Sequence, residues 1–126
     1  MPVHVLVVED DEGIREAVAY GLQNAGYSVV EAADGDAGLE AARGRRPDLI
    51  LVDLMVPGPS GAQLCRLLRR AAPKVPIVVM TAHVLDPDER SRLGLDELWL
   101  VTKPFSMTEL FSAIDAAQGG RNTRAS

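Results

Sequence analysis

The chain has 126 residues, enough for one domain with its own core and too few for two. Its 47% apolar and 25% charged residues are typical of a soluble globular protein, and a formal charge of −5 argues against a surface for nucleic acid or anionic membranes. A single cysteine, Cys65, excludes an internal disulfide framework, and no run approaches the roughly 20 apolar residues of a membrane span, so we expect a cytoplasmic protein without membrane contact.

The first half of the chain alternates apolar runs with segments of helical spacing. Gly26 is suited to end the first helical segment, and Asp34 is suited to cap the second. The run at 49–52 has no polar interruption, which is typical of a strand buried on both faces. In chain order the expected elements are strand, helix, strand, helix and strand, at 3–8, 14–25, 28–31, 34–44 and 49–52.

The second half continues the alternation. Ser60 is suited to cap a helix that ends before Pro73, and Asp86 precedes a proline at the first position of a short helix. Ser106 and Glu109 form the sequence pattern of a capping box. The expected elements are a helix from 60, a strand at 76–81, a short helix from 86, a strand at 98–101 and a helix at 106–117.

Five strands that alternate with five helices predict a parallel sheet covered by helices on both faces, a doubly wound α/β fold. We expect one domain at 1–118. Residues 119–126 have the composition of a flexible tail or the start of a linker.

Polar side chains follow the strands at the edge where all carboxyl ends meet. Glu9 and Asp10 follow the first strand, Asp53 ends the third, Thr81 ends the fourth, and Lys103 follows the fifth. Acids gathered there repel one another unless a cation neutralises them, and Mg2+ suits carboxylates with phosphate oxygens. A carboxylate beside Mg2+ can be a nucleophile toward phosphorus, with a hydroxyl and an ammonium group on the other oxygens.

Several of these residues also have a plainer interpretation. Thr81 taken alone is an ordinary strand threonine, and Lys103 is a surface lysine beside a turn. Asp53 taken alone is a solvated turn acid as readily as a reactive group. Asp11 and Glu12 are assigned to the acidic first turn of a helix, where they favour the helix dipole.

Four short motifs, in this order and spacing, resemble the receiver domain of two-component response regulators over about Val3–Ala117. They are Val-Val-Glu9-Asp10-Asp11, Asp53-Leu-Met-Val-Pro57-Gly-Pro-Ser-Gly61, Met-Thr81-Ala82 and Lys103-Pro104-Phe105. The resemblance implies a bacterial signalling domain with a flavodoxin-like (βα)5 fold and strand order 2-1-3-4-5.

The resemblance also implies roles for the residues at the sheet edge. Asp53 would accept a phosphoryl group from a histidine kinase or a phosphotransfer histidine. Glu9 and Asp10 would form the acidic pair, with Asp10 a direct Mg2+ ligand, Asp53 a ligand as well, and the backbone carbonyl of Met55 a further one. Thr81 would hydrogen-bond the phosphoryl group.

Lys103 would pair with that group, and the resemblance implies a cis bond between Lys103 and Pro104. It further implies no enzyme activity beyond self-catalysed gain and loss of the phosphoryl group. Phosphorylation would switch the surface around the fourth and fifth helices and the fifth strand. That surface would serve a downstream protein or output domain, and it is compatible with a phosphorylation-dependent dimer.

Two departures from the family pattern concern the route from the site to that surface. Leu100 stands where the family often has an aromatic switch residue; its neighbour Trp99 is either a partly buried packing residue or an exposed substitute for that aromatic. Gly94–Leu98 replaces the usual Gly-Ala segment. His83 is either a loop residue without a role or, with Met55, a control on the access of water.

Two other functions compete with a phosphorylated receiver. One is a pseudo-receiver that acts only as an interaction module, which the intact acidic residues argue against. The other is a phosphatase of the haloacid-dehalogenase type, which would carry a second acid two residues after the nucleophile, where this chain has Met55.

Overall fold

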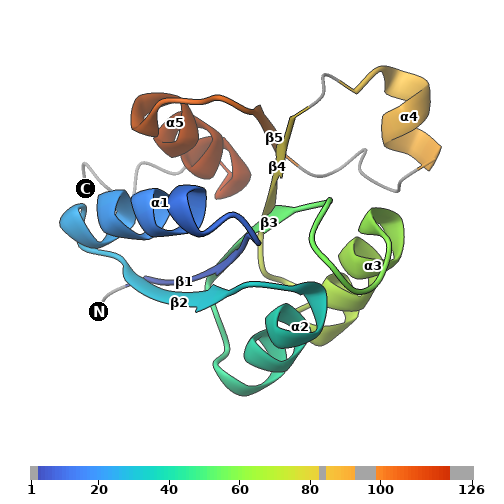
Figure 1. Ribbon diagram of the computed structural model, residues 1–126, viewed down its shortest axis with the longest axis horizontal. Coiled ribbons are helices and arrows are strands. Elements are labelled where there is room, and N and C mark those ends of the chain that lie inside the picture. The colour runs from blue at the N-terminus through green and yellow to red at the C-terminus, as the bar shows by residue number, and fades with distance from the viewer. Residues whose placement is uncertain (1–2, 83–84, 93–98, 120–126) are drawn as a thin grey trace.

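A five-stranded parallel sheet lies at the centre of the computed structural model, which describes residues 3–82, 85–92 and 99–119 (Figure 1). The strands are ordered β2-β1-β3-β4-β5, as the resemblance implied, and every neighbouring pair is parallel. The strands are β1 His4–Val8, β2 Ser28–Ala32, β3 Leu49–Asp53, β4 Ile77–Thr81 and β5 Trp99–Thr102. The helices are α1 Glu12–Asn24, α2 Gly35–Gly44, α3 Gly61–Ala71, α4 Pro87–Arg92 and α5 Met107–Ala117.

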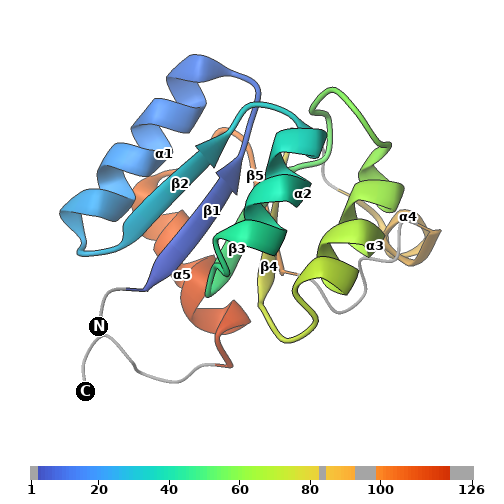
Figure 2. The same ribbon diagram turned by 90° about the horizontal axis from the view of Figure 1, so that it is seen from below.

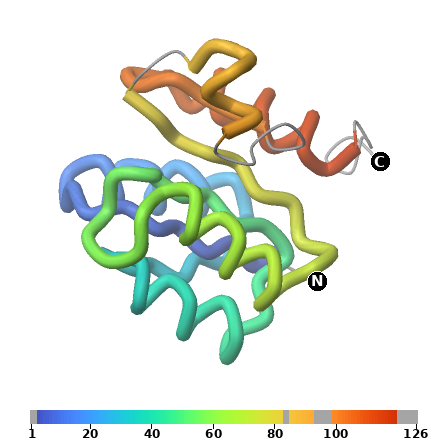
Figure 3. The backbone as a smooth tube through the Cα atoms, turned by 90° about the vertical axis from the view of Figure 1, so that its right-hand side faces the viewer, coloured from blue at the N-terminus to red at the C-terminus, as the bar shows by residue number. Residues whose placement is uncertain are grey.

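Helices cover both faces of the sheet, which confirms the doubly wound α/β prediction. Helices α2 and α3 lie together on one face and α5 on the other, and α1 lies beside α5 (Figures 1 and 3). Successive residues of β1 alternate between the two layers, because side chains along a strand point to opposite faces. Leu6 and Val8 contact the core beneath α2 and α3, and Val5 and Val7 contact the core beneath α1 and α5.

The continuous apolar runs of β3 and β4 follow from this arrangement. Every residue of both strands is buried, since each strand has neighbours on both sides and helices on both faces. Asp53 and Thr81 are the polar residues within these two strands, and both lie at the carboxyl end of the sheet. Burial therefore restricts polar side chains in β3 and β4 to the edge that carries the site.

The helices begin where the capping residues predicted. Asp34 Oδ1 accepts a hydrogen bond from Ala37 N at 2.8 Å, and Ser60 Oγ accepts one from Gln63 N at 3.3 Å. Ser106 and Glu109 form the predicted capping box, with both bonds at 3.0 Å. Strand limits differ from the predictions by one residue at several ends, and Leu98 lies outside the described residues.

Helix α4 is short, with six residues and none of them buried. His83 and Gly94–Leu98, on which expectations were placed, lie outside the described residues. None of the helices in the described ranges is long and apolar enough to cross a bilayer.

Candidate functional site

The acidic loop after β1 is held by backbone hydrogen bonds. Glu9 is fully buried, and its backbone N–H donates to Ala32 O at 3.0 Å, which extends the ladder with β2. One carboxylate oxygen of Glu9, Oε2, accepts a hydrogen bond from Asp11 N at 3.1 Å. Asp10 is exposed, so the two acids of the predicted pair lie in different environments.

Asp53 ends β3 as a buried carboxylate, 5% exposed, with both oxygens engaged. Oδ1 accepts a hydrogen bond from Met55 N at 2.8 Å, and Oδ2 lies 2.6 Å from Lys103 Nζ. The Met55 side chain is 73% exposed, so Met55 contributes its backbone to the site. A buried acid with partners on both oxygens is not the solvated turn acid of the plainer interpretation.

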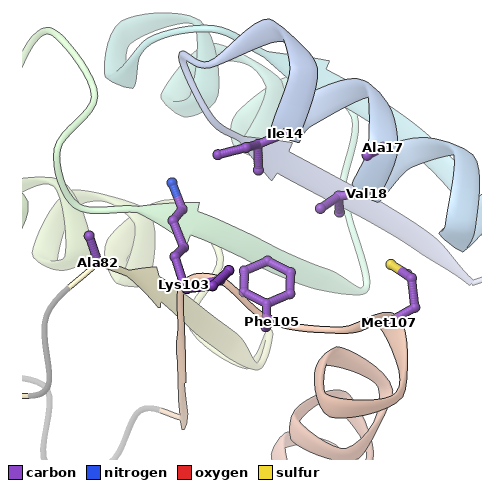
Figure 4. Close-up of a pocket in the computed structure, with 8 residues that line it drawn as sticks. Ile14, Ala17, Val18, Ala82, Lys103, Phe105 and Met107 are labelled. Carbon is purple, nitrogen blue, oxygen red and sulfur yellow. The ribbon is translucent and has the colours of Figure 1, made fainter.

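Lys103 joins the two buried acids. Its ammonium nitrogen lies 2.5 Å from Glu9 Oε1 and 2.6 Å from Asp53 Oδ2. The side chain extends from the segment after β5 toward the end of β3 (Figure 4). The Lys103–Pro104 peptide bond is cis, as the resemblance implied.

The electrostatics of this group follow from burial and pairing. Burial raises the pKa of the Glu9 carboxyl above its ordinary value, and the charge of Asp53 adds to the rise. Lys103 and the Asp11 N–H oppose that rise without cancelling it. Burial alone would lower the pKa of Lys103, but the carboxylates of Asp53 and Glu9 outweigh it, and the pKa is raised. The site therefore holds its ammonium charged and its two acids close together.

Three of the predicted metal ligands lie close enough to share one ion. Glu9, Asp10 and Asp53 each offer a carboxylate oxygen, and these atoms lie within 4.8 Å of one another. Glu9 Oε1 is buried and makes no well-aligned hydrogen bond among the described residues, although Lys103 Nζ is its ion-pair partner. Carboxylate oxygens are what a hard divalent cation prefers, so this donor set fits a metal ion.

Asp11 has a structural place beside that cluster. It is the N-cap of α1, and its Oδ1 accepts a hydrogen bond from Ile14 N at 2.9 Å. This agrees with its assignment to the helix start rather than to the metal ligands.

Thr81 is buried at the end of β4, which pairs with β3. Asp53 pairs with Met80 in the β3–β4 register, which puts Thr81 one residue beyond Asp53 toward the edge. Its carbonyl oxygen accepts a hydrogen bond from Lys103 N at 2.7 Å. This backbone hydrogen bond directly connects Thr81 and Lys103, the two residues expected to supply the hydroxyl and ammonium groups.

Arg15 was not anticipated from the sequence. Its guanidinium donates to the backbone carbonyl of Glu9 at 2.9 Å and pairs with Glu31 Oε1 at 3.3 Å. It therefore ties the acidic loop to the neighbouring strand. The only signal in the sequence was an arginine about one helical turn after the acids. Because its partner is a backbone carbonyl, no particular residue type at the partner position could indicate the contact.

An apolar groove of about 570 Å³ adjoins the site on the face of α1 and α5. Ile14 and Val18 of α1 face Phe105 and Met107 across it, and Lys103 lies at one end (Figure 4). The groove thus begins at the residue that contacts Asp53.

The β5 residues Leu100 and Trp99, for which the resemblance raised expectations, differ in burial. Leu100 is half-buried and packs against the core beneath α2 and α3. Trp99 keeps 45% of its surface exposed, so this large aromatic residue is partly buried and partly open to solvent. Among the described residues β5 pairs with β4 alone, so Trp99 lies on an edge strand of the sheet.

Comparison with known proteins places the chain in a family. The fold and the acid-lined sheet edge define a flavodoxin-like α/β domain with a candidate metal site. The response regulator receiver domain family matches residues 5–115, so the chain belongs to that family. It is a receiver domain of two-component signal transduction, a signalling domain rather than an enzyme of the usual kind.

Relatives and solved structures agree with this assignment. Transcriptional regulatory protein CseB of Streptomyces avermitilis is 43% identical over 115 residues, which cover 90% of this chain and 48% of that protein. The chain spans about half the length of the curated relatives it matches. The chemotaxis response regulator CheY4 of Vibrio cholerae is 29% identical with a TM-score of 0.82, over 93% of this chain and 99% of that one.

A third similar structure is the receiver domain of a sensor histidine kinase from Pseudomonas aeruginosa, solved with a magnesium ion coordinated in its active-site cleft. It is 28% identical with a TM-score of 0.81, and the match covers 94% of this chain and 99% of that one.

Proposed function

We propose that Asp53 is the phosphoryl acceptor of this receiver domain and that Thr81 and Lys103 stabilise the transferred group. The observation that carries the proposal is the buried Asp53 carboxylate, held 2.6 Å from Lys103 Nζ beside two further acids. Family membership supports the same chemistry, because receiver domains work with kinases and outputs.

The proposed step is a transfer to a carboxylate oxygen. An oxygen of Asp53 attacks phosphorus and forms a P–O bond, while the P–N bond of a phosphohistidine breaks and its electron pair returns to the imidazole. The product is an acyl phosphate. Lys103 Nζ already contacts Oδ2, so the ammonium lies beside the oxygens of a group attached there. We assign the Thr81 hydroxyl to another of these oxygens.

Glu9, Asp10, Asp53 and the Met55 carbonyl would hold Mg2+. When bound, this ion neutralises the gathered negative charge of acids and phosphoryl oxygens. The donor set of this chain and the magnesium-containing receiver domain from Pseudomonas aeruginosa support this choice of metal.

The direct test is labelling with a small donor. Wild-type protein incubated with acetyl phosphate and Mg2+ should gain the mass of one phosphoryl group, and chelation of Mg2+ should prevent this. Beryllofluoride with Mg2+ should change Trp99 fluorescence. Absence of the adduct with acetyl phosphate and Mg2+, together with no fluorescence change on adding beryllofluoride, would support the pseudo-receiver interpretation instead.

Asp10→Ala should weaken Mg2+ binding by at least about tenfold, because it removes the exposed carboxylate of the cluster. Isothermal titration calorimetry measures this directly. Asp11→Ala is the matched control, since Asp11 caps α1 and should affect helix stability more than Mg2+ affinity. The opposite ranking of the two variants would move the ligand role to Asp11.

We assign the groove between α1 and the segment after β5 to the phosphohistidine-bearing partner. A protein donor must approach Asp53, and this apolar groove begins at Lys103. Burial of apolar surface there would hold the donor in place.

Ala17→Glu should reduce phosphotransfer from a protein donor by about tenfold or more, because Ala17 is exposed and lines this groove. Labelling by acetyl phosphate should be unchanged, since the small donor does not need the groove. Tyr20→Glu is the matched control on the same helix, 69% exposed and outside the groove. Equal loss with both donors would refute the docking role.

The remaining proposals concern the whole protein. We propose that the receiver domain ends near residue 118, that residues 119–126 begin a linker, and that an output domain or separate protein responds to phosphorylation through α4, β5 and α5. The relatives named as transcriptional regulators, about twice as long, support a nucleic-acid-binding output outside this domain. Self-catalysed loss of the phosphoryl group, a phosphorylation-dependent dimer and a cytoplasmic location are further proposals from family membership.

A further inference from the structure

The sheet edge opposite Asp53 carries a basic region that the phosphoryl site does not use. Residues 43–74 contain seven Lys or Arg and two Asp, a formal charge of +5, while the rest of the chain carries −10. Most of these cations lie where α2 and α3 end, beyond the amino ends of β3 and β4. Helices α2 and α3 lie side by side (Figure 2), so the basic residues at 43–46 and those at 66–74 lie near one another.

A groove of about 410 Å³ lies between these helix ends; we call it the α2–α3 groove. Its floor is apolar and includes Ala42, Pro47 and Val75. Its rim carries three exposed cations, Arg43, Arg46 and Lys74. An apolar floor with a cationic rim suits an apolar side chain flanked by carboxylates.

Local structure accounts for Arg69 and Arg43 of the basic region but not for the rim residues Arg46 and Lys74. Arg69 donates to the carbonyls of Pro73 and Val75, at 3.2 and 3.1 Å, and so holds the connection between α3 and β4. Arg43 lies in the last turn of α2, where a cation favours the helix dipole. Arg46 and Lys74 lie outside both helices, and none of the three rim cations has an ion-pair partner within the described ranges.

Arg46 adds a second observation. Its φ of +48° places it in the left-handed region, which glycine adopts freely and an L side chain adopts at a cost. A glycine would serve the turn better, so the backbone does not account for arginine at this position. What the side chain contributes is a cation on the rim.

From these observations we propose that the α2–α3 groove binds an acidic protein segment. An apolar side chain of the segment would enter the floor, and flanking Asp or Glu residues would pair with Arg43, Arg46 and Lys74. A short segment fits better than nucleic acid or an anionic membrane, because extended polyanions would also meet the −10 of the remaining chain. Since the groove and Asp53 lie at opposite edges of the sheet, a partner could stay bound through phosphorylation.

The test uses two synthetic peptides of equal charge, Glu-Glu-Leu-Glu-Glu and Glu-Glu-Ser-Glu-Glu, titrated into 15N-labelled protein. The leucine peptide should shift amide signals at 42–46, 71, 72, 74 and 75 and leave those of 53, 81 and 103 unchanged. The serine peptide should bind several-fold more weakly, and added salt should weaken both. Absence of shifts up to millimolar peptide would overturn the proposal.

The variant Arg46→Glu/Lys74→Glu should lose at least about tenfold in affinity for the leucine peptide. Arg92→Glu on α4 is the matched control for a reversed surface charge and should bind like wild type. Equal loss in that control, or no loss in the double variant, contradicts the assignment. A DNA duplex or a phosphatidylglycerol vesicle that competes as well as the peptide would also overturn the choice of a protein segment.

Arg46→Gly separates binding from folding. The unfolding temperature should stay unchanged or rise, because glycine accepts the left-handed backbone, while peptide affinity should fall several-fold. If Arg46→Gly bound the leucine peptide as tightly as wild type, Arg46 would have no role in binding, and this result would contradict the proposal.

Discussion

Asp53→Asn should leave a folded protein that gains no phosphoryl group from acetyl phosphate in Mg2+, under conditions that label wild type. Asparagine has the shape of aspartate but no anionic oxygen to attack phosphorus. The fold should survive, because Lys103 keeps Glu9 as a partner at 2.5 Å and Met55 N can still donate to the amide oxygen. Intact-protein mass spectrometry measures the adduct, and circular dichroism checks the fold.

Asp48→Asn is the matched control for this change. Asp48 is an exposed acid just before the same strand, and its Oδ2 accepts a hydrogen bond from His4 N at 2.9 Å. It should label like wild type. A labelled Asp53→Asn protein would place the acceptor at another residue and refute the proposed chemistry.

The fold could be predicted because strands that are buried on both faces have a recognisable apolar pattern in the sequence. β3 and β4 are buried on both faces, and they appear as unbroken apolar runs that end in Asp53 and Thr81. Edge strand β5 gave a weaker pattern, and its predicted start, Leu98, lies outside the described residues. The strand order came from the resemblance, since periodicity does not specify which strands are neighbours.

The candidate site was predictable as a set of residues and not as a set of contacts. Parallel strands bring their carboxyl ends to one edge, which was enough to collect Glu9, Asp53 and Lys103. That a single ammonium group joins both acids depends on the path of the segment after β5. The brace from Arg15 to the carbonyl of Glu9 depends on side-chain length and helix position in the same way.

Lys103→Met should destabilise the metal-free protein at about pH 7 by roughly 3 kcal/mol, the usual effect of removing one partner from a buried ion pair. Methionine fills similar space without charge, so the fully buried Glu9 and the 5% exposed Asp53 would face each other with no cation between them. Chemical denaturation in the presence of a chelator measures the free energy of unfolding. Lys103→Arg keeps the charge and should lose much less stability.

Magnesium should restore much of that stability, and the variant should bind Mg2+ roughly tenfold more tightly than wild type or better, because the competing ammonium is gone. Calorimetric titration of wild type and variant measures both effects. A variant as stable as wild type in chelator, with unchanged Mg2+ affinity, would mean that the close contacts of Lys103 carry no net energy.

The pH dependence gives an independent check on the same contacts. Burial raises the folded-state pKa of Glu9, so its contribution to stability is full below the ordinary value of 4.5 and is lost as pH rises through the raised value. Lys103→Met removes an opposing influence and raises that pKa further, so the deficit of the variant should shrink as pH falls from about 7 toward 5. The raised pKa of Lys103 has its effect at alkaline pH. The contribution of Lys103 to the stability of the folded protein is present below pH 10.5 and is lost as pH rises through the folded-state pKa. The advantage of wild type over the variant should therefore narrow at both acid and alkaline pH. A difference that stayed constant across this range would show that lost packing, and not the paired charge, accounts for the effect of the substitution.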